Sequence, residues 1–153
     1  MSKDQDVLRV TERLRCLCSR REYCSADILK KAADALDGDK DAAEQILQVL
    51  MSEKYVDDLR YATAYARDKA MISGWGATKI RYMLSAKRIP RDLITQAIAE
   101  IDEDKADSRL QKLLENKARS LKDDPQRRLK LLRFALGRGY QYDDVKKVID
   151  TLM

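Results

Sequence analysis

The sequence predicts an all-α fold of three tandem three-helix repeats that form an elongated, curved array. Charged residues make up 37% of the chain and hydrophobic residues 44%, whereas glycine (5) and proline (2) are scarce, a composition typical of helices. The chain has no alternating strand pattern and no two-residue hairpin turn. In addition, an apolar pattern returns about every fifty residues, which indicates stacked helical units.

This repeat is clearest between the middle and the last third of the chain. The apolar positions of residues 79–98 recur 51 residues later, in residues 130–149. A step of 48 residues back aligns them with residues 31–50, so that a basic residue recurs at Lys31, Lys79 and Lys130. Because any two amphipathic helices can be aligned in part, three unrelated helix pairs are the alternative interpretation.

We place the first repeat at residues 1–56. A first helix over residues 5–17 would gather Val7, Leu14 and Leu17 on one face. A second helix would begin near Cys24 or Ser25 and end at residues 37–39, and a third would cover residues 40–53. Tyr55 and Val56 then form a corner that leads into the next repeat.

The second repeat is placed at residues 57–101. Asp57 or Asp58 would cap a fourth helix, whose alanine-rich stripe allows close packing, and Gly74-Trp75-Gly76 would end it. Ile80 belongs to the apolar face of a fifth helix, and Pro90 fits the first turn of a sixth.

The third repeat is placed at residues 102–153. A seventh helix follows the polar residues 102–105, an eighth would start at Asp123-Asp124-Pro125, and a ninth would follow residues 137–140. Each unit is too small for a full core, so we expect neighbouring repeats to share apolar surface. A compact nine-helix globule is the alternative.

Several classes of function lack their usual residues. The chain has no histidine, which is the commonest general base, and it has no nucleotide-binding or hydrolase motif. The aspartate pairs at 57–58, 123–124 and 143–144 stand where helices should begin, which favours capping over catalysis. Three clustered cysteines without histidine make a poor zinc site. We therefore expect neither an enzyme nor a cofactor or metal.

The chain also lacks an apolar stretch long enough to cross a bilayer and a signal sequence at its amino end. We therefore expect a cytoplasmic protein without membrane contact. We also expect a monomer.

Positive charge is concentrated in the last two thirds of the chain. The net charge is +5, yet residues 1–56 carry 10 basic and 11 acidic residues. Residues 60–91 hold eight basic residues and one acidic residue, and residues 127–138 hold five basic residues and none that is acidic. Such clusters could line one side of the array and attract phosphate backbones. Alternatively, they are ordinary solvated helix faces. Tyr82 is the best-placed aromatic for base stacking, although a structural role is favoured.

The middle third carries a series of separate motifs. It comprises Tyr55-Val56-Asp57-Asp58-Leu59-Arg60-Tyr61-Ala62, Gly74-Trp75-Gly76, and Lys79-Ile80 followed by Lys87-Arg88-Ile89. This pattern resembles the RecX family of recombination regulators. The chain departs from the family in having Val56 for leucine, Tyr61 for phenylalanine and Arg88 for glycine. At the start of the second helix, Ser25 could take the capping role one position later than usual. We expect these motif residues to serve mainly the fold: Tyr55, Asp57, Asp58, Ala62, Gly74, Trp75, Gly76 and Ile80.

The resemblance implies a small helical protein that is not an enzyme. It would bind the RecA recombinase filament on single-stranded DNA and suppress its ATPase and strand-exchange activities. A rod of repeats could touch several protomers at once, and its basic helices could add attraction to single- or double-stranded DNA. From charge we expect these residues to face the filament or its DNA: Lys31, Arg67, Lys69, Lys79, Arg81, Lys87, Arg88, Lys130, Arg133 and Arg138.

A stand-alone DNA-binding helical regulator is the rival hypothesis. Residues 77–98 could form a helix-turn-helix with its turn at residues 87–90. Its second helix would be mostly apolar, however, and would offer few contacts to bases.

Overall fold

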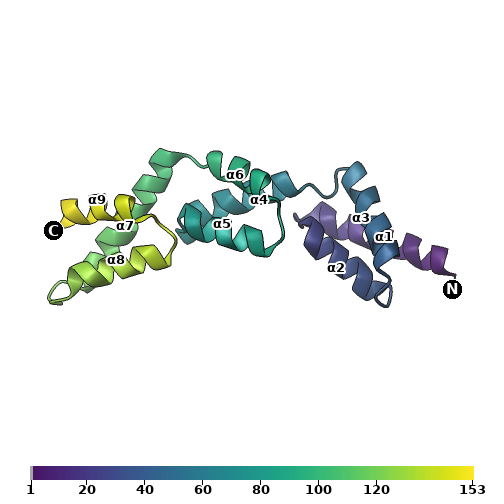
Figure 1. Ribbon diagram of the computed structural model, residues 1–153, viewed down its shortest axis with the longest axis horizontal. Helices are drawn as coiled ribbons and strands as arrows, with labels where there is room; N and C mark the ends of the chain where they lie inside the picture. The colour runs from purple at the N-terminus through teal and green to yellow at the C-terminus, as the bar shows by residue number, and fades with distance from the viewer. Residues whose placement is uncertain (1) are drawn as a thin grey trace.

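The computed structural model describes residues 2–153, and Figure 1 shows them as an elongated, curved array of helices. The first group contains α1 (Lys3–Arg20), α2 (Ser25–Ala35) and α3 (Lys40–Ser52). The second contains α4 (Asp58–Asp68), the π-helical turn η1 (Lys69–Ser73), α5 (Ala77–Ala86) and α6 (Arg91–Ala99). The third contains α7 (Glu103–Ser120), α8 (Arg127–Gly137) and α9 (Tyr142–Leu152). Residues 2–153 contain no strand, so the all-α prediction of tandem three-helix units is confirmed.

Each helix group has its own buried core. Ile28, Ile46 and Leu50 lie at the centre of the first, and Leu114 and Leu131 lie at the centre of the third. The second core contains the side chains of α4, α5 and α6 together with one fully buried residue of the first group, Cys24. Neighbouring groups share apolar surface as expected where Cys24 and Ala26 enter the second core. The expectation that one unit is too small for a core of its own was wrong, because three short amphipathic helices already enclose a small core.

The predicted step of 48 residues between the first two groups was also wrong. The third helices of the groups follow Asp39, Pro90 and Gln141, which are 51 residues apart in both steps. A slip of three residues is close to one helical turn, so apolar residues still align with apolar residues. Lys31 therefore does not occupy the position of Lys79, whereas Lys130 does.

Several helix ends differ from the sequence prediction. α1 begins earlier, because Ser2 and Gln5 form a reciprocal capping box. Pro90 precedes α6 rather than lying in its first turn. α8 starts at Arg127, because Asp124 accepts a hydrogen bond from the Gln126 backbone in a separate turn.

Polar contacts join the first two groups. The backbone N–H and the hydroxyl of Ser25 donate to the carboxylate of Asp58, at 2.7 and 2.6 Å. Asp58 thus caps α2 from the following group, and Ser25 does not act as the predicted cap. Lys87 pairs with Asp27 at 3.3 Å, and Arg60 pairs with Glu22.

The second and third groups meet backbone to backbone. The N–H of Gly76 donates to the carbonyl of Arg138 at 2.8 Å, and the N–H of Thr78 donates to the carbonyl of Gly139 at 3.1 Å. The end of α8 therefore satisfies the free N–H groups at the start of α5. The two helices follow each other nearly end to end along one edge of the array (Figure 1), so their dipoles run head to tail.

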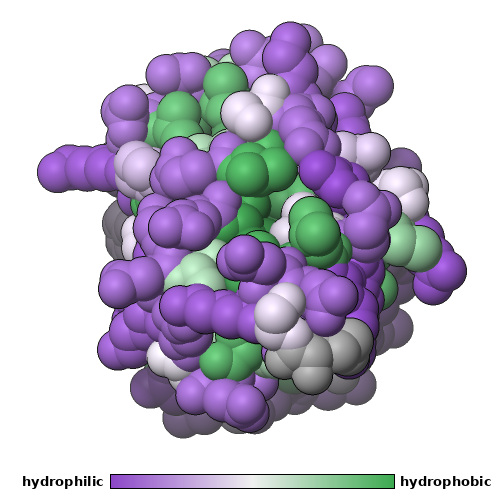
Figure 2. All heavy atoms as spheres, turned by 90° about the vertical axis from the view of Figure 1, so that its right-hand side faces the viewer, coloured by the Kyte–Doolittle hydropathy of each residue, from purple (hydrophilic) through white to green (hydrophobic). Residues whose placement is uncertain are grey.

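The first group closes one end of the array. Figure 2 shows this end with apolar side chains in the middle of the face and hydrophilic side chains around them. The exposed large apolar residues of this group are Leu8, Val49 and Met51, of which Leu8 is the most exposed at 66%.

Candidate protein and nucleic-acid interface

Three of the predicted interface residues are engaged within the protein. Lys87 forms the ion pair with Asp27, and Lys130 contacts Asp124 at 2.5 Å. The guanidinium of Arg138 donates to the carbonyl of Ser73 at 2.8 Å and lies over the ring of Phe134 at 5.0 Å. Lys87 and Arg138 thus join neighbouring groups, whereas Lys130 pairs within the third group, and all three charges are partly satisfied before any partner binds.

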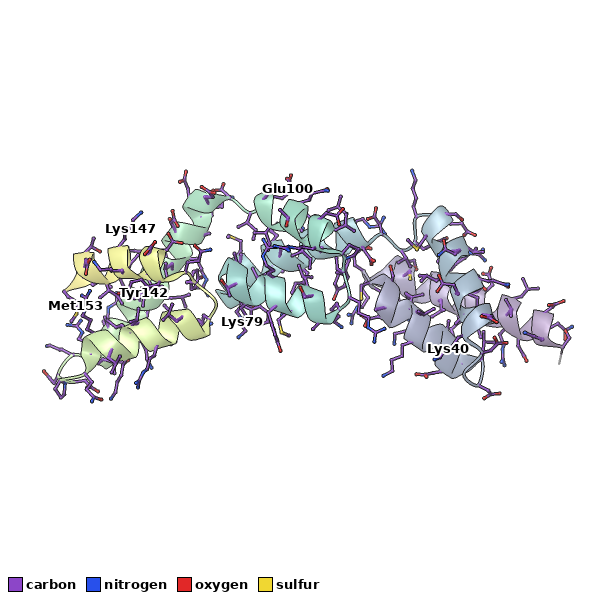
Figure 3. All side chains as sticks on the ribbon, viewed as in Figure 1. Lys40, Lys79, Glu100, Tyr142, Lys147 and Met153 are labelled. Carbon is purple, nitrogen blue, oxygen red and sulfur yellow. The ribbon has the colours of Figure 1, made fainter. Side chains whose placement is uncertain are left out.

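Two further basic residues contact the ring of Trp75 at the junction between the second and third groups. The ammonium groups of Lys69 and Lys79 lie 4.8 and 4.4 Å from the centre of its indole ring. Lys69 also lies 5.5 Å from the ring of Tyr65, whose edge meets Trp75 at 6.4 Å. Cation–π attraction fixes both lysine side chains while leaving their hydrogen-bond donors free for a phosphate. Lys79 lies at the start of α5, beside the end of α8 (Figure 3).

The remaining predicted residues are spread over the array. Lys31, Arg67, Arg88 and Arg133 are exposed, and the guanidinium of Arg81 donates to the hydroxyl of Thr95 at 3.2 Å. Lys31 belongs to the first group, where it lies 5.5 Å from the ring of Tyr23. The structure therefore brings Lys69, Lys79 and Arg138 together at one junction, and it does not bring all ten residues into one patch.

Sequence reasoning missed two basic residues at this junction. The guanidinium of Arg109 donates to the carbonyl of Ile72 at 3.2 Å, and Lys117 lies 5.3 Å from the ring of Phe134, which Arg138 also contacts. Both residues come from α7, where the acidic residues of 102–107 stand before Arg109 and where Lys117 lies outside the two basic runs at 60–91 and 127–138.

Tyr82 also differs from its sequence interpretation. The favoured structural role was wrong, because the side chain is 73% exposed on α5, between the positions of Lys79 and Arg88. An exposed ring flanked by basic residues can stack on a nucleobase.

The family-motif residues mostly support the fold. Ala62 and Ile80 are fully buried, and Gly74 and Gly76 flank Trp75 at the junction. Asp57 caps α4 by accepting a hydrogen bond from the Arg60 backbone at 3.0 Å, as the sequence predicted for Asp57 or Asp58. Tyr55 is half-buried and packs against the first core.

The helix-turn-helix segment places its second helix against the protein. Ile94 and Ala97 of α6 are buried against the second core, and the first turn of α6 carries Asp92. The exposed face of α6 carries Arg91, Asp92, Thr95 and Gln96, so its one arginine is offset by an adjacent acid.

Residues 2–153 lack both a metal-binding cluster and a membrane-spanning helix. No group of three or more histidine, cysteine, aspartate or glutamate side chains in this range is arranged to hold a metal ion. None of the helices in the same range is long and apolar enough to cross a membrane.

Comparison with known sequences agrees with the arrangement of the groups. Residues 57–98 match the second three-helix domain of RecX, and residues 103–149 match the third. The regulatory protein RecX of Vibrio parahaemolyticus is 33% identical over 132 residues, which cover 84% of this chain and 82% of that protein. The regulatory protein RecX of Clostridium botulinum is 35% identical over 72% of this chain, which spans about half the length of the clostridial relatives.

Solved structures show the same fold. RecX from Lactobacillus salivarius superposes with a TM-score of 0.87 at 21% identity, over 97% of both chains. A second structure of a regulatory protein RecX superposes with a TM-score of 0.85 at 22% identity, over 95% of this chain and 72% of the other. Because the two family matches cover more than half of the chain and the Vibrio relative is 33% identical over most of both chains, the chain belongs to the RecX family of regulatory proteins.

Proposed function

We propose that this protein binds a RecA-type recombinase filament on single-stranded DNA and mainly inhibits its ATPase and recombinase activities. The observation that carries the proposal is an elongated array of three helix groups in a chain of the RecX family. A rod of this kind can contact successive protomers of a polymer, so that several weak contacts add up to tight binding. Binding one filament geometry better than another would shift the filament toward it.

The basic residues of the second and third groups support an additional contact with DNA. Lys69 and Lys79 are held beside Trp75, and Arg67, Arg88 and Arg133 are exposed. Phosphate attraction from such residues is independent of base sequence and weakens with salt, which suits a filament that forms on any sequence. We further propose three units at residues 1–56, 57–101 and 102–153, a monomer and a cytoplasmic location.

Co-sedimentation with RecA filaments on single-stranded DNA tests the proposal. The parent protein should pellet with the filament, and replacing Arg67 and Arg133 with glutamate should weaken its binding roughly tenfold by removing phosphate contacts. The matched control replaces Arg13 and Lys30, which are exposed and lie in the first group. Absence of the parent from the filament pellet would exclude the proposed function. An equal loss of filament binding in both variants would exclude a specific contact through Arg67 and Arg133.

Tyr82 offers a second test of the DNA contact. Tyr82→Ala should lower the affinity for the filament by about 1–3 kcal/mol if the ring stacks on a base. Tyr142 is the control, because it is also exposed (52%) but lies on α9. The contact with bases is excluded if both alanine variants bind alike.

A further inference from the structure

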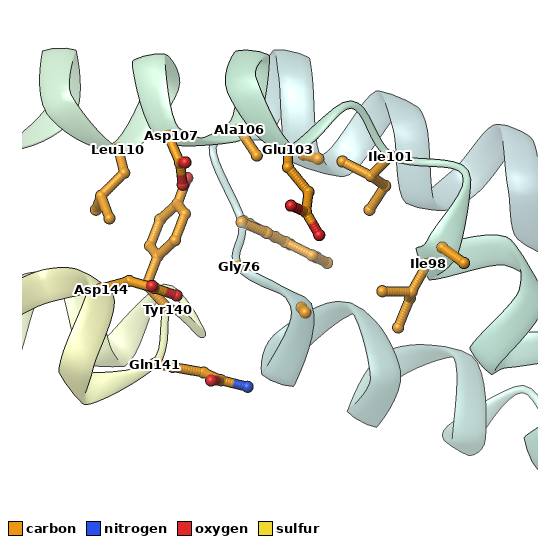
Figure 4. A pocket seen from close by; sticks show the side chains of 14 residues that line it. Gly76, Ile98, Ile101, Glu103, Ala106, Asp107, Leu110, Tyr140, Gln141 and Asp144 are labelled. Atoms are coloured by element: carbon orange, nitrogen blue, oxygen red, sulfur yellow. The ribbon is translucent and has the colours of Figure 1, made fainter.

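An acidic groove lies at the junction of the second and third helix groups, on a chain whose net charge is positive. The groove has a volume of about 400 Å³. Figure 4 shows Ile98 and Ile101 on one side, Leu110 and Tyr140 on the other, and the side chain of Glu103 between them. Its lining residues include three carboxylates and no lysine or arginine.

The three carboxylates are Glu103 and Asp107 of α7 and Asp144 of α9. All three are exposed, and none has an ion-pair or hydrogen-bond partner within the described chain, residues 2–153. Glu103 and Asp144 stand in first turns, where helix dipoles favour them. Asp107 lies beyond the first turn of α7, so the dipole does not account for it.

The walls of the groove are apolar and aromatic. The indole of Trp75 lines it, although Lys69 and Lys79, which lie over the same ring, do not. The hydroxyl of Tyr140 is buried and lacks a hydrogen-bond partner among residues 2–153, and burial raises its pKa, so it remains a neutral donor. Lys147 lines an adjoining depression with Asp107 and Asp144, and Lys112 lines another with Asp107.

We infer that this groove, hereafter the acidic groove, binds a basic side chain next to an apolar one on the surface of a protein partner. The carboxylates would pair with an arginine or lysine, and the apolar walls would take its methylene stem and its apolar neighbour. Nucleic acid is unsuited to the acidic groove because three carboxylates repel its phosphates. The inference rests on the proposed function only in taking the recombinase as the partner.

The single tryptophan of the chain allows the acidic groove to be tested directly, since Trp75 lines it. The probe is the peptide acetyl-Leu-Arg-Leu-Arg-amide at millimolar concentration, with the glutamate version of the same peptide for comparison. The basic peptide should shift the Trp75 emission in a saturable manner, and the acidic peptide should not. No saturable shift with the basic peptide would overturn the inference.

Isosteric variants then connect the acidic groove to the filament. The groove variant combines Glu103→Gln, Asp107→Asn and Asp144→Asn. The control variant combines Asp34→Asn, Asp41→Asn and Asp92→Asn, which are exposed positions outside the acidic groove. It removes the same amount of negative charge as the groove variant. It also matches the groove variant in changing two residues in first turns of helices, Asp41 and Asp92. Circular dichroism checks folding, and Asp107→Asn alone repeats the test without altering a helix terminus.

Filament co-sedimentation distinguishes the outcomes. The groove variant should bind RecA filaments about tenfold more weakly than the control variant, whereas both should bind free single-stranded DNA at least as tightly as the parent. Equal filament binding by the two variants would overturn the inference and leave the proposed function intact. If the parent does not bind filaments but the basic peptide still shifts the Trp75 emission, the proposed function is wrong, whereas the inference that the acidic groove binds basic side chains is supported.

Discussion

Gly76 and Gly139 touch through their backbones, and this contact joins the second and third helix groups. A Cβ atom on Gly76 would lie 2.4 Å from the carbonyl carbon and oxygen of Gly139, and one on Gly139 would lie 2.4 Å from the Cβ of Lys79. Gly139 also adopts a φ of 93°, which side chains rarely allow. Only glycine therefore permits the two hydrogen bonds that join α8 to α5.

Gly76→Ala should destabilise the protein and loosen the junction. Because the clash involves backbone atoms that cannot rotate away, we expect a loss of about 1–3 kcal/mol in the free energy of unfolding. Urea unfolding measures the loss, and amide exchange of Gly76 and Thr78 should become faster. Gly137→Ala is the control, since a Cβ there meets nothing within 4 Å and alanine favours the helix. The account of the junction is wrong if both variants have the same effect.

Arg88→Gly should stabilise the protein. Arg88 follows α5 with a φ of 61°, the left-handed conformation that costs a side-chain residue about 1–2 kcal/mol. Part of that gain is offset, because glycine has more conformational freedom than arginine in the unfolded chain. We therefore expect an increase of about 0.5–1 kcal/mol in the free energy of unfolding. Arg88→Ala, which keeps the strain and removes the charge, should show no such increase in the same urea titration. A similar increase for alanine would point to charge rather than to backbone conformation.

Asp58 and Ser25 should be energetically coupled across the first two groups. Asp58 accepts two hydrogen bonds from Ser25, and hydrogen bonds to a charged group contribute about 1.5–3 kcal/mol. A double-mutant cycle of Asp58→Ala and Ser25→Ala reports the hydroxyl bond, because alanine keeps the backbone N–H, and it should give a coupling of roughly 0.5–3 kcal/mol in unfolding free energy. The same cycle with Asp57→Ala should give almost none, because Asp57 caps its own helix. A coupling of zero between Asp58 and Ser25 would show that their side-chain contact does not contribute to the stability of the protein.

Cys24 should resist thiol reagents while the protein is folded. Its side chain is fully buried, and burial raises the pKa of the thiol to about 11, so the reactive thiolate is scarce at pH 8. Cys16 is exposed and should react first with iodoacetamide, as peptide mass spectrometry can show. The raised pKa also favours the folded state below pH 9, the ordinary value for this thiol, and that contribution is lost as the pH rises toward 11. Equal labelling of Cys16 and Cys24 would contradict the buried position.

The fold was predictable from the sequence because apolar spacing alone defines amphipathic helices. That same spacing could not fix the register of the first group, since a slip of one turn preserves the pattern while moving Lys31 away from the position of Lys79. The three separate cores were also missed, because spacing identifies the buried face of a helix and not its neighbour.

The interface was predicted less well, for a physical reason. Positive charge in the sequence identifies basic residues but not their partners, so the pairs Lys87–Asp27 and Lys130–Asp124 could not be foreseen. The acidic groove escaped notice because its carboxylates come from two helices about forty residues apart and meet only in the fold.

The rate of ATP hydrolysis by RecA on single-stranded DNA, measured while this protein is titrated in, shows whether the protein inhibits the filament. We expect the rate to fall as the protein occupies the filament, and the groove variant to require about ten times more protein for the same inhibition. An unchanged rate at protein concentrations that saturate the filament would contradict this expectation.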